Sequence, residues 1–142
     1  MLKGIDPLLG PGLLAILRGM GHGDEIVLAD ANFPATALAQ RLERADGVDA
    51  VRMLRAIASV MPLDDFVPKA AFSMAVVGSA EEVPDVVHKF EAVLAETGYR
   101  AGIDALERQA FYDRARKAYA IVATGETRLY GNLILKKGVL RL

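Results

Sequence analysis

A histidine between two glycines is the first residue of this chain whose type suits proton transfer. His22 lies in the segment Met20-Gly21-His22-Gly23-Asp24. Imidazole titrates near pH 6.5 and therefore exchanges protons at neutral pH, and flanking glycines let backbone and ligand approach closely. A loop histidine that only satisfies local hydrogen bonds explains the same spacing and is the more common case. The second histidine, His88, lies among helix residues beside Lys89 and indicates a solvated helix surface.

Three further polar segments have side chains that could bind a polar ligand. Asp30 closes an apolar run directly before a turn, where a carboxylate accepts hydrogen bonds from ligand hydroxyls or orients a histidine. An ordinary turn aspartate fits that position equally well. Arg108 can donate several hydrogen bonds, although a surface salt bridge is its more usual role. An aromatic face, an open backbone and an amide follow one another at Tyr130, Gly131 and Asn132. The Gly-Asn pair is also common in ordinary turns.

Composition excludes several other kinds of chemistry. The chain of 142 residues has no cysteine, so it has no disulfide, thiolate zinc site or thiol nucleophile. Two histidines make a multi-histidine metal site improbable. Seventeen Lys and Arg against eighteen Asp and Glu give a net charge of −1, which lacks the basic footprint that nucleic-acid binding requires. No P-loop, GxSxG or strand-linked GxGxxG is present.

Alternating apolar runs predict the elements that must position these residues. Four short runs predict buried strands, and four segments with helical spacing of apolar residues predict helices. Asp6-Pro7 predicts a further helix start, while residues 35–45 and 101–107 are ambiguous, the second favouring a strand. The predicted strands are 25–30, 70–77, 119–124 and 133–135, and the predicted helices are 11–17, 48–58, 86–94 and 109–118.

Strands that alternate with helices predict an α/β fold. We expect one domain over residues 1–142, with a largely parallel sheet covered by helices on both faces. In such sheets, ligands bind beyond the carboxyl ends of the strands. Asp30 and the loop after it are therefore the first place to look for a site.

The apolar content predicts more buried surface than one small domain needs. Counted with glycine and without tyrosine, apolar residues make up about 59% of the chain, against a usual ~45–50%. Part of this excess can cover subunit interfaces, because obligate interfaces resemble a core cut in half. The apolar run near the start is interrupted by Pro and Gly, and no run reaches the ~20 residues of a membrane span. We therefore expect a soluble cytoplasmic protein without a membrane partner.

Taken together, the chain resembles the ribose pyranase / L-fucose mutarotase family over nearly its whole length. The combination of GHGD, DANFPA and YGN in that order is specific, and GHGDE, FYDRA and YGN are closer to the fucose mutarotase branch. One departure is Asn32, where some members of that branch carry His before Phe-Pro. The matching stretches are MLKGIDPLL, GMGHGDEIVLADANFPA, RADG, AFYDRARKAYAIVATGE and YGNLILKKGV.

The resemblance implies an isomerase that interconverts the anomers of a free monosaccharide, most closely L-fucose. It implies His22 as the catalytic acid/base, and it implies sugar binding by Asp30, Arg108, Tyr130, Gly131 and Asn132. It further implies homo-oligomers, including decameric rings, with sites near subunit boundaries and with no metal or organic cofactor. Asp30 is expected to orient His22 or to bind hydroxyls, and Tyr130 to carry a second proton.

Two alternative functions stay open at this point. The same fold could act on D-ribose, exchanging its pyranose and furanose forms. The chain could also be a non-catalytic sugar-binding or assembly module that retains the pocket and binds sugar without accelerating exchange.

Overall fold

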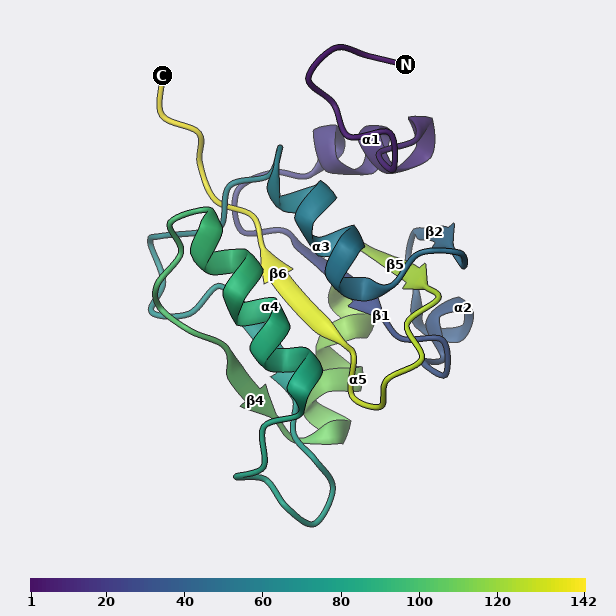
Figure 1. Cartoon of the computed structure of the whole chain (residues 1–142), viewed down its shortest axis with the longest axis vertical. Helices are drawn as coiled ribbons and strands as arrows, with labels where there is room; N and C mark the ends of the chain where they lie inside the picture. Colours follow the sequence, from purple (N-terminus) through teal and green to yellow (C-terminus); the bar gives the residue numbers. More distant parts are fainter.

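All six strands of the protein belong to one sheet, with five helices packed around it (Figure 1). The computed structural model describes residues 1–142. The strands are β1 (Glu25–Ala29), β2 (Leu42–Ala45), β3 (Ala71–Met74), β4 (Asp104–Leu106), β5 (Ala120–Thr124) and β6 (Leu133–Lys136). The helices are α1 (Pro11–Gly19), α2 (Ala35–Leu38), α3 (Ala50–Ala58), α4 (Asp85–Glu96) and α5 (Arg108–Lys117). No helix is both long enough and apolar enough to cross a membrane.

The sheet is mixed but mostly parallel, as the alternating pattern predicts. Its strand order is β2-β5-β1-β6-β3-β4. β5 pairs in parallel with β1 and β2, and β3 pairs in parallel with β4. Only β6 runs antiparallel to both of its neighbours, β1 and β3. The carboxyl ends of the other five strands therefore meet at one edge of the sheet, together with the first residue of β6.

Helices cover both faces of the sheet, which confirms the expected architecture. Successive side chains of a strand point to opposite faces, so Ile26 and Leu28 of β1 face one core while Val27 and Ala29 face the other. The first core also contains the buried faces of α1, α3 and α4, and the second contains those of α2 and α5. Strands buried on both faces explain the continuous apolar runs in the sequence.

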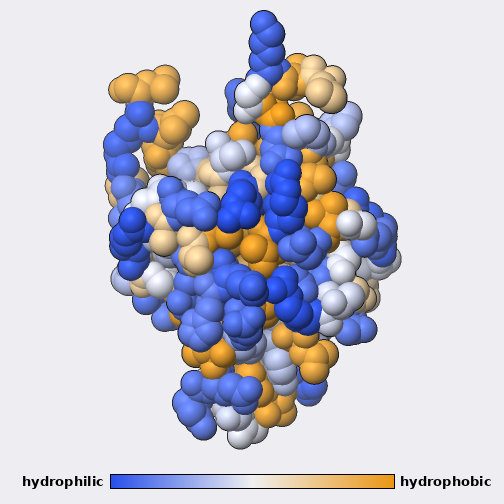
Figure 2. Space-filling view, viewed as in Figure 1, coloured by the Kyte–Doolittle hydropathy of each residue, from blue (hydrophilic) through white to orange (hydrophobic).

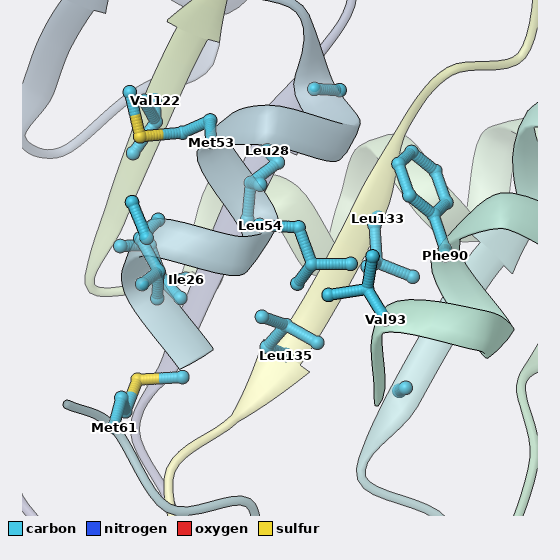
Figure 3. Packing of buried hydrophobic residues seen from close by; sticks show 14 of the residues in the cluster. Ile26, Leu28, Met53, Leu54, Met61, Phe90, Val93, Val122, Leu133 and Leu135 are labelled. Atoms are coloured by element: carbon cyan, nitrogen blue, oxygen red, sulfur yellow. The ribbon is translucent and has the colours of Figure 1, made fainter. Parts of the chain in front are cut away.

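The first core is built where α3 and α4 pack against β6 (Figure 3). Asp49 caps α3 by accepting a hydrogen bond from the Arg52 amide, and the helix then buries Leu54. Phe90 of α4 and Leu133 of β6 lie close by and are fully buried. This packing fixes β6, whose first residue follows directly on one of the predicted site segments.

The structure resolves the ambiguous segments and corrects one expectation. Residues 35–45 contain both a short helix, α2, and an edge strand, β2, while residues 101–107 contain the strand β4. Asp6-Pro7 does not begin a helix. The Asp6 carboxylate accepts hydrogen bonds from the Leu8 amide and from both terminal nitrogens of Arg52, so it closes a turn and an ion pair instead.

Candidate active site

A small pocket of about 210 Å³ lies at the edge where the parallel strands end. Asp30 follows β1, Arg108 begins α5 directly after β4, and Asn132 immediately precedes β6. Tyr130 lies two residues before Asn132 and also lines the pocket. Four of the five predicted sugar-binding residues are thus brought together by strands that are distant in the sequence.

Asp30 and Asn132 form a reciprocal hydrogen-bonded pair at the base of this pocket. The Asp30 amide donates to Asn132 Oδ1 at 2.8 Å, and Asn132 Nδ2 donates to Asp30 Oδ2 at 2.8 Å. Asp30 Oδ1 accepts from the Asn32 amide at 2.9 Å. Burial raises the pKa of the Asp30 carboxyl, against these hydrogen bonds, which lower it. Both carboxylate oxygens already have protein partners, so a ligand hydroxyl would meet a rigidly held acceptor.

The Tyr130-Gly131-Asn132 turn is held in a constrained conformation. Tyr130 has a φ of 62°, which is uncommon for a residue with a side chain. Its hydroxyl accepts a hydrogen bond from the Val77 amide at 3.1 Å, so its own proton is available to another acceptor. Gly131 is buried behind the turn and does not line the pocket. A Cβ there would lie 2.5 Å from Glu126 Cγ, so glycine at position 131 lets the turn pack closely against Glu126.

Tyr112 is a pocket residue that the sequence did not single out. It lies one helical turn after Arg108 on α5, so both side chains share a face of the helix and line the pocket. Its ring packs at a steep angle against Phe33, with centroids 5.5 Å apart. The i, i+4 spacing from Arg108 was the available signal for this residue.

The rest of the pocket is apolar. Phe33, Met74, Val77 and Leu129 line it beside the two tyrosines. Val77 and Leu129 are exposed at the rim, whereas Met74 is buried at the end of β3. The pocket thus combines convergent hydrogen-bonding groups with an apolar wall, which suits a small ligand carrying hydroxyls on one side and hydrocarbon on the other.

His22 lies at the opposite end of the sheet. It precedes β1 while Asp30 follows it, and five residue rises along a strand span roughly 16 Å. His22 is 46% exposed, and its Nε2 lies 3.0 Å from Oδ1 of the buried Asp64. Within one chain Asp30 therefore does not orient His22, and Asp64 takes that role. The sequence offered no spacing signal for a pair that lies 42 residues apart.

Asp64 is held in the form that accepts a hydrogen bond from His22. Burial opposes its ionisation, but hydrogen bonds from the Phe66 amide and from His22 keep the pKa of Asp64 below its usual value. The carboxylate accepts from Nε2–H, which leaves Nδ1 of His22 free to exchange a proton. The Phe66 ring lies 5.1 Å from the His22 ring and shields one side of it.

Exposed apolar side chains gather at both ends of the molecule. Phe66, Leu140 and Leu142 lie at the His22 end, where a hollow of about 600 Å³ opens behind Asp64. Val77 and Leu129 lie at the rim of the Asp30 pocket, as described above. Figure 2 shows apolar surface both near the chain termini and at the opposite tip. Each end therefore presents surface that a neighbouring molecule could cover.

Glu126 is the most deeply buried carboxylate beside the pocket, at 2% exposure. Hydrogen bonds from Arg128 lower its pKa to about 2, against the cost of burial. Its contribution to folding is present above the unfolded pKa of about 4.5 and is lost as pH falls toward 2.

Acid should therefore destabilise the fold partly through Glu126. Between pH 5 and pH 2, denaturant titrations should show a loss on the order of 3 kcal/mol attributable to this group. Glu126→Gln should be less stable at pH 7 but should lose less stability over that interval. Parallel pH dependences for the two proteins would contradict the assignment.

The fold and its pocket define a class, namely α/β domains that place a small polar and apolar pocket at the carboxyl edge of a mixed sheet. The chain belongs to the RbsD / FucU transport protein family, whose model matches residues 3–140. It is 49% identical to the fucose mutarotase of Homo sapiens, covering 99% of this chain and 96% of that protein. The family resemblance found in the sequence is thereby confirmed.

Two solved structures separate the branches of the family. A fucose mutarotase from Streptococcus pneumoniae in complex with L-fucose has a TM-score of 0.93 and 46% identity, covering 99% of this chain and 100% of that chain. RbsD from Bacillus subtilis, complexed with D-ribose, has a TM-score of 0.74 and 25% identity, covering 99% and 100%. Both fold and sequence are therefore more similar to the L-fucose complex than to the D-ribose complex.

Proposed function

We propose that this chain is a mutarotase that interconverts the α and β anomers of L-fucose. The observation that carries the proposal is the pocket at the end of β1, where Asp30, Arg108 and Asn132 face an apolar wall. L-Fucose is a 6-deoxy sugar, so it has hydroxyls for the polar groups and a methyl group for the wall. The similarity to fucose mutarotases over the whole chain supports the same substrate.

The reaction requires only proton transfers and one reversible bond cleavage. A base removes the proton of the anomeric hydroxyl while an acid protonates the ring oxygen, and the bond between C1 and the ring oxygen breaks. The resulting aldehyde rotates about the C1–C2 bond, and the ring oxygen attacks its other face as the protons return. Positioned acid and base groups typically accelerate such steps by ~10²–10⁴. Neither a metal nor an organic cofactor is needed.

His22 is the main proton carrier in this proposal, and Tyr130 is the second. With Nε2 held by Asp64, Nδ1 is the ring nitrogen of His22 that exchanges a proton with the sugar. Tyr130 lines the pocket, and its hydroxyl accepts a hydrogen bond from the Val77 amide, so its own proton is available to a ligand. Asp30, Arg108 and Asn132 hold the sugar hydroxyls, and Gly131 permits the turn that presents Tyr130 and Asn132.

His22 and the pocket act together only if two copies of the chain share a site. The strand β1 separates them within one copy, so the His22 of one molecule must approach the pocket of another. Apolar residues exposed at both ends support such a head-to-tail contact. Repeated contacts of this kind form a closed ring when the rotations between successive copies add up to a full turn. We therefore propose a homo-oligomer, with the decamer implied by the family resemblance as the expected form, acting on free sugar in the cytoplasm.

Asp64→Asn should reduce the turnover number about tenfold and change KM little. The amide retains the size of the buried side chain but weakens the acceptor that fixes the His22 ring. Exchange rates measured by saturation-difference NMR over a range of L-fucose concentrations give both constants. Asp65→Asn, an exposed neighbour paired with Arg141, is the matched control. An unchanged turnover number in Asp64→Asn would remove Asp64 from the mechanism.

The apolar wall should favour L-fucose over D-arabinose by about 10–200-fold in kcat/KM. D-Arabinose has the same pyranose ring configuration as L-fucose but lacks the methyl group. One methyl group buried against Met74 and Leu129 supplies that discrimination. Equal kcat/KM for the two sugars would exclude the wall as the methyl site. Binding of L-fucose without faster exchange would instead support the non-catalytic module.

A further inference from the structure

We propose that Glu126 and Arg128 are a positioning pair that sets the geometry of the sugar-binding turn, although neither residue lines the pocket. The inference rests on the proposed function, because it assigns a role in binding the sugar. Glu126 lies just after β5, and Arg128 follows two residues later in the loop that leads to Tyr130.

The carboxylate of Glu126 is fully occupied by the loop and by a neighbouring helix. Its Oε1 accepts from the backbone amide and the Nε of Arg128, at 2.9 and 2.8 Å. Its Oε2 accepts from Arg128 Nη2 at 2.8 Å and from the Ala50 amide, at the start of α3, at 3.2 Å. A guanidinium that binds a buried carboxylate through two nitrogens fixes the orientation of the two groups as well as pairing their charges. The loop is thereby fastened to the amino end of α3.

The backbone of Glu126 fastens the loop to the segment that carries Asp30. Its carbonyl accepts from the Ala31 amide at 2.9 Å, and its amide donates to Thr124 Oγ1 at 3.2 Å. Thr124 in turn donates to the Ala29 carbonyl at 2.7 Å. Glu126 therefore connects the ends of β1 and β5 at the residue beside Asp30.

The side chain of Glu126 also forms the surface on which the turn rests. Its Cγ occupies the space that a Cβ of residue 131 would need, so Gly131 packs directly against it. The Gly131 amide donates to the Arg128 carbonyl at 3.2 Å, which closes the loop between the pair and the turn. Tyr130 keeps its positive φ only while these contacts of Glu126, Arg128 and Gly131 hold the turn. Displacing the pair would shift both the Tyr130 hydroxyl and the Asn132 amide.

This geometry predicts a specific kinetic signature. The pair controls Asn132, which holds the sugar, and Tyr130, the second proton carrier, whereas the main carrier His22 lies at the opposite end of the sheet and is untouched. Loss of the pair should therefore raise KM more than it lowers the turnover number. A role in folding alone would reduce the fraction of active protein, and hence the apparent turnover number, without changing KM.

The test uses Glu126→Gln in the full oligomer, with L-fucose exchange followed by saturation-difference NMR. We expect KM for L-fucose to rise about tenfold, with the turnover number within threefold of wild type. Glu96→Gln is the matched control, since it breaks an exposed Arg–Glu pair between α3 and α4 far from the pocket. Arg128→Lys, which keeps the charge but not the fork, should raise KM in the same direction.

The outcomes separate this inference from the function itself. A folded Glu126→Gln protein with the wild-type KM would overturn the positioning role, whether its turnover number is lower or unchanged. Should Glu126→Gln fail to fold, the KM of Arg128→Lys decides between the same two outcomes. A wild-type protein that does not accelerate L-fucose exchange would overturn the proposed function before the variants are compared.

Discussion

His22→Ala is expected to lose accelerated exchange between the anomers of L-fucose, by about 10²–10⁴ in the turnover number. Alanine removes the imidazole that we propose carries the proton, while the proposed sugar-binding residues Asp30, Arg108 and Asn132 remain in place. The fold should not change, because the His22 side chain is 46% exposed and buried Asp64 keeps its hydrogen bond from the Phe66 amide. Saturation-difference NMR measures the rate, and titration calorimetry should show L-fucose binding within about threefold of wild type.

His88→Ala is the matched control for this experiment. His88 is an exposed histidine on α4, with only a distant ion pair to Glu91, and its removal should leave the exchange rate unchanged. Wild-type exchange in His22→Ala would contradict the assignment of His22 as the proton carrier. An equal loss in both variants would point to a general effect of removing surface histidines.

At L-fucose concentrations well below the KM of Arg108→Ala, mixing His22→Ala with Arg108→Ala should restore activity that neither variant has alone. If each site combines His22 of one copy with Arg108 of the next, random mixing leaves about a quarter of the sites with both groups intact. Both side chains are exposed in the single chain, so neither substitution should disturb the fold of a copy. Co-expression with two different affinity tags, followed by tandem purification, gives the mixed oligomers to be assayed.

Two results would contradict a site shared between copies. Mixed oligomers that remain as inactive as the parents would show that His22 and Arg108 do not meet across a boundary. A wild-type monomer with full activity at working concentration would contradict the shared site as well. Mixing His22→Ala with His88→Ala is the control, since it should give activity in proportion to the His88→Ala copies.

Local sequence patterns predicted most of the elements because their causes are local. The apolar run from residue 25 to 30 is buried on both faces, and the helical spacing around Leu54 follows the buried face of α3. Residues 35–45 were ambiguous for a physical reason, because they contain a four-residue helix and a four-residue edge strand. Elements that short are set by tertiary packing more than by propensity.

The arrangement of the candidate site depended on contacts that no local pattern contains. The grouping of Asp30 with Asn132 follows from β1 and β6 being neighbours in the sheet, and β6 runs against the other strands. The partner of His22 proved to be Asp64, on a loop held beside β6 by the Lys136 carbonyl. Pairing of strands and loops across the chain decides both points, so spacing along the sequence could not.

The apolar excess of the sequence also acquires a definite location. Two buried cores take up the interior, one on each face of the sheet. Exposed apolar residues then remain at the His22 end and at the pocket rim, including Phe66 and Leu129. These are the surfaces that the proposed head-to-tail contact would cover, so the composition and the geometry of the site favour the same assembly.

The most direct measurement is the exchange rate of the wild-type protein on L-fucose and D-ribose, side by side. Saturation-difference NMR on each sugar at equilibrium reports the rate between its forms with and without protein. We predict a large acceleration for L-fucose and a kcat/KM at least about tenfold lower for D-ribose, which offers no methyl group to the apolar wall. Faster exchange of D-ribose than of L-fucose, or exchange of neither sugar, would contradict the proposed function.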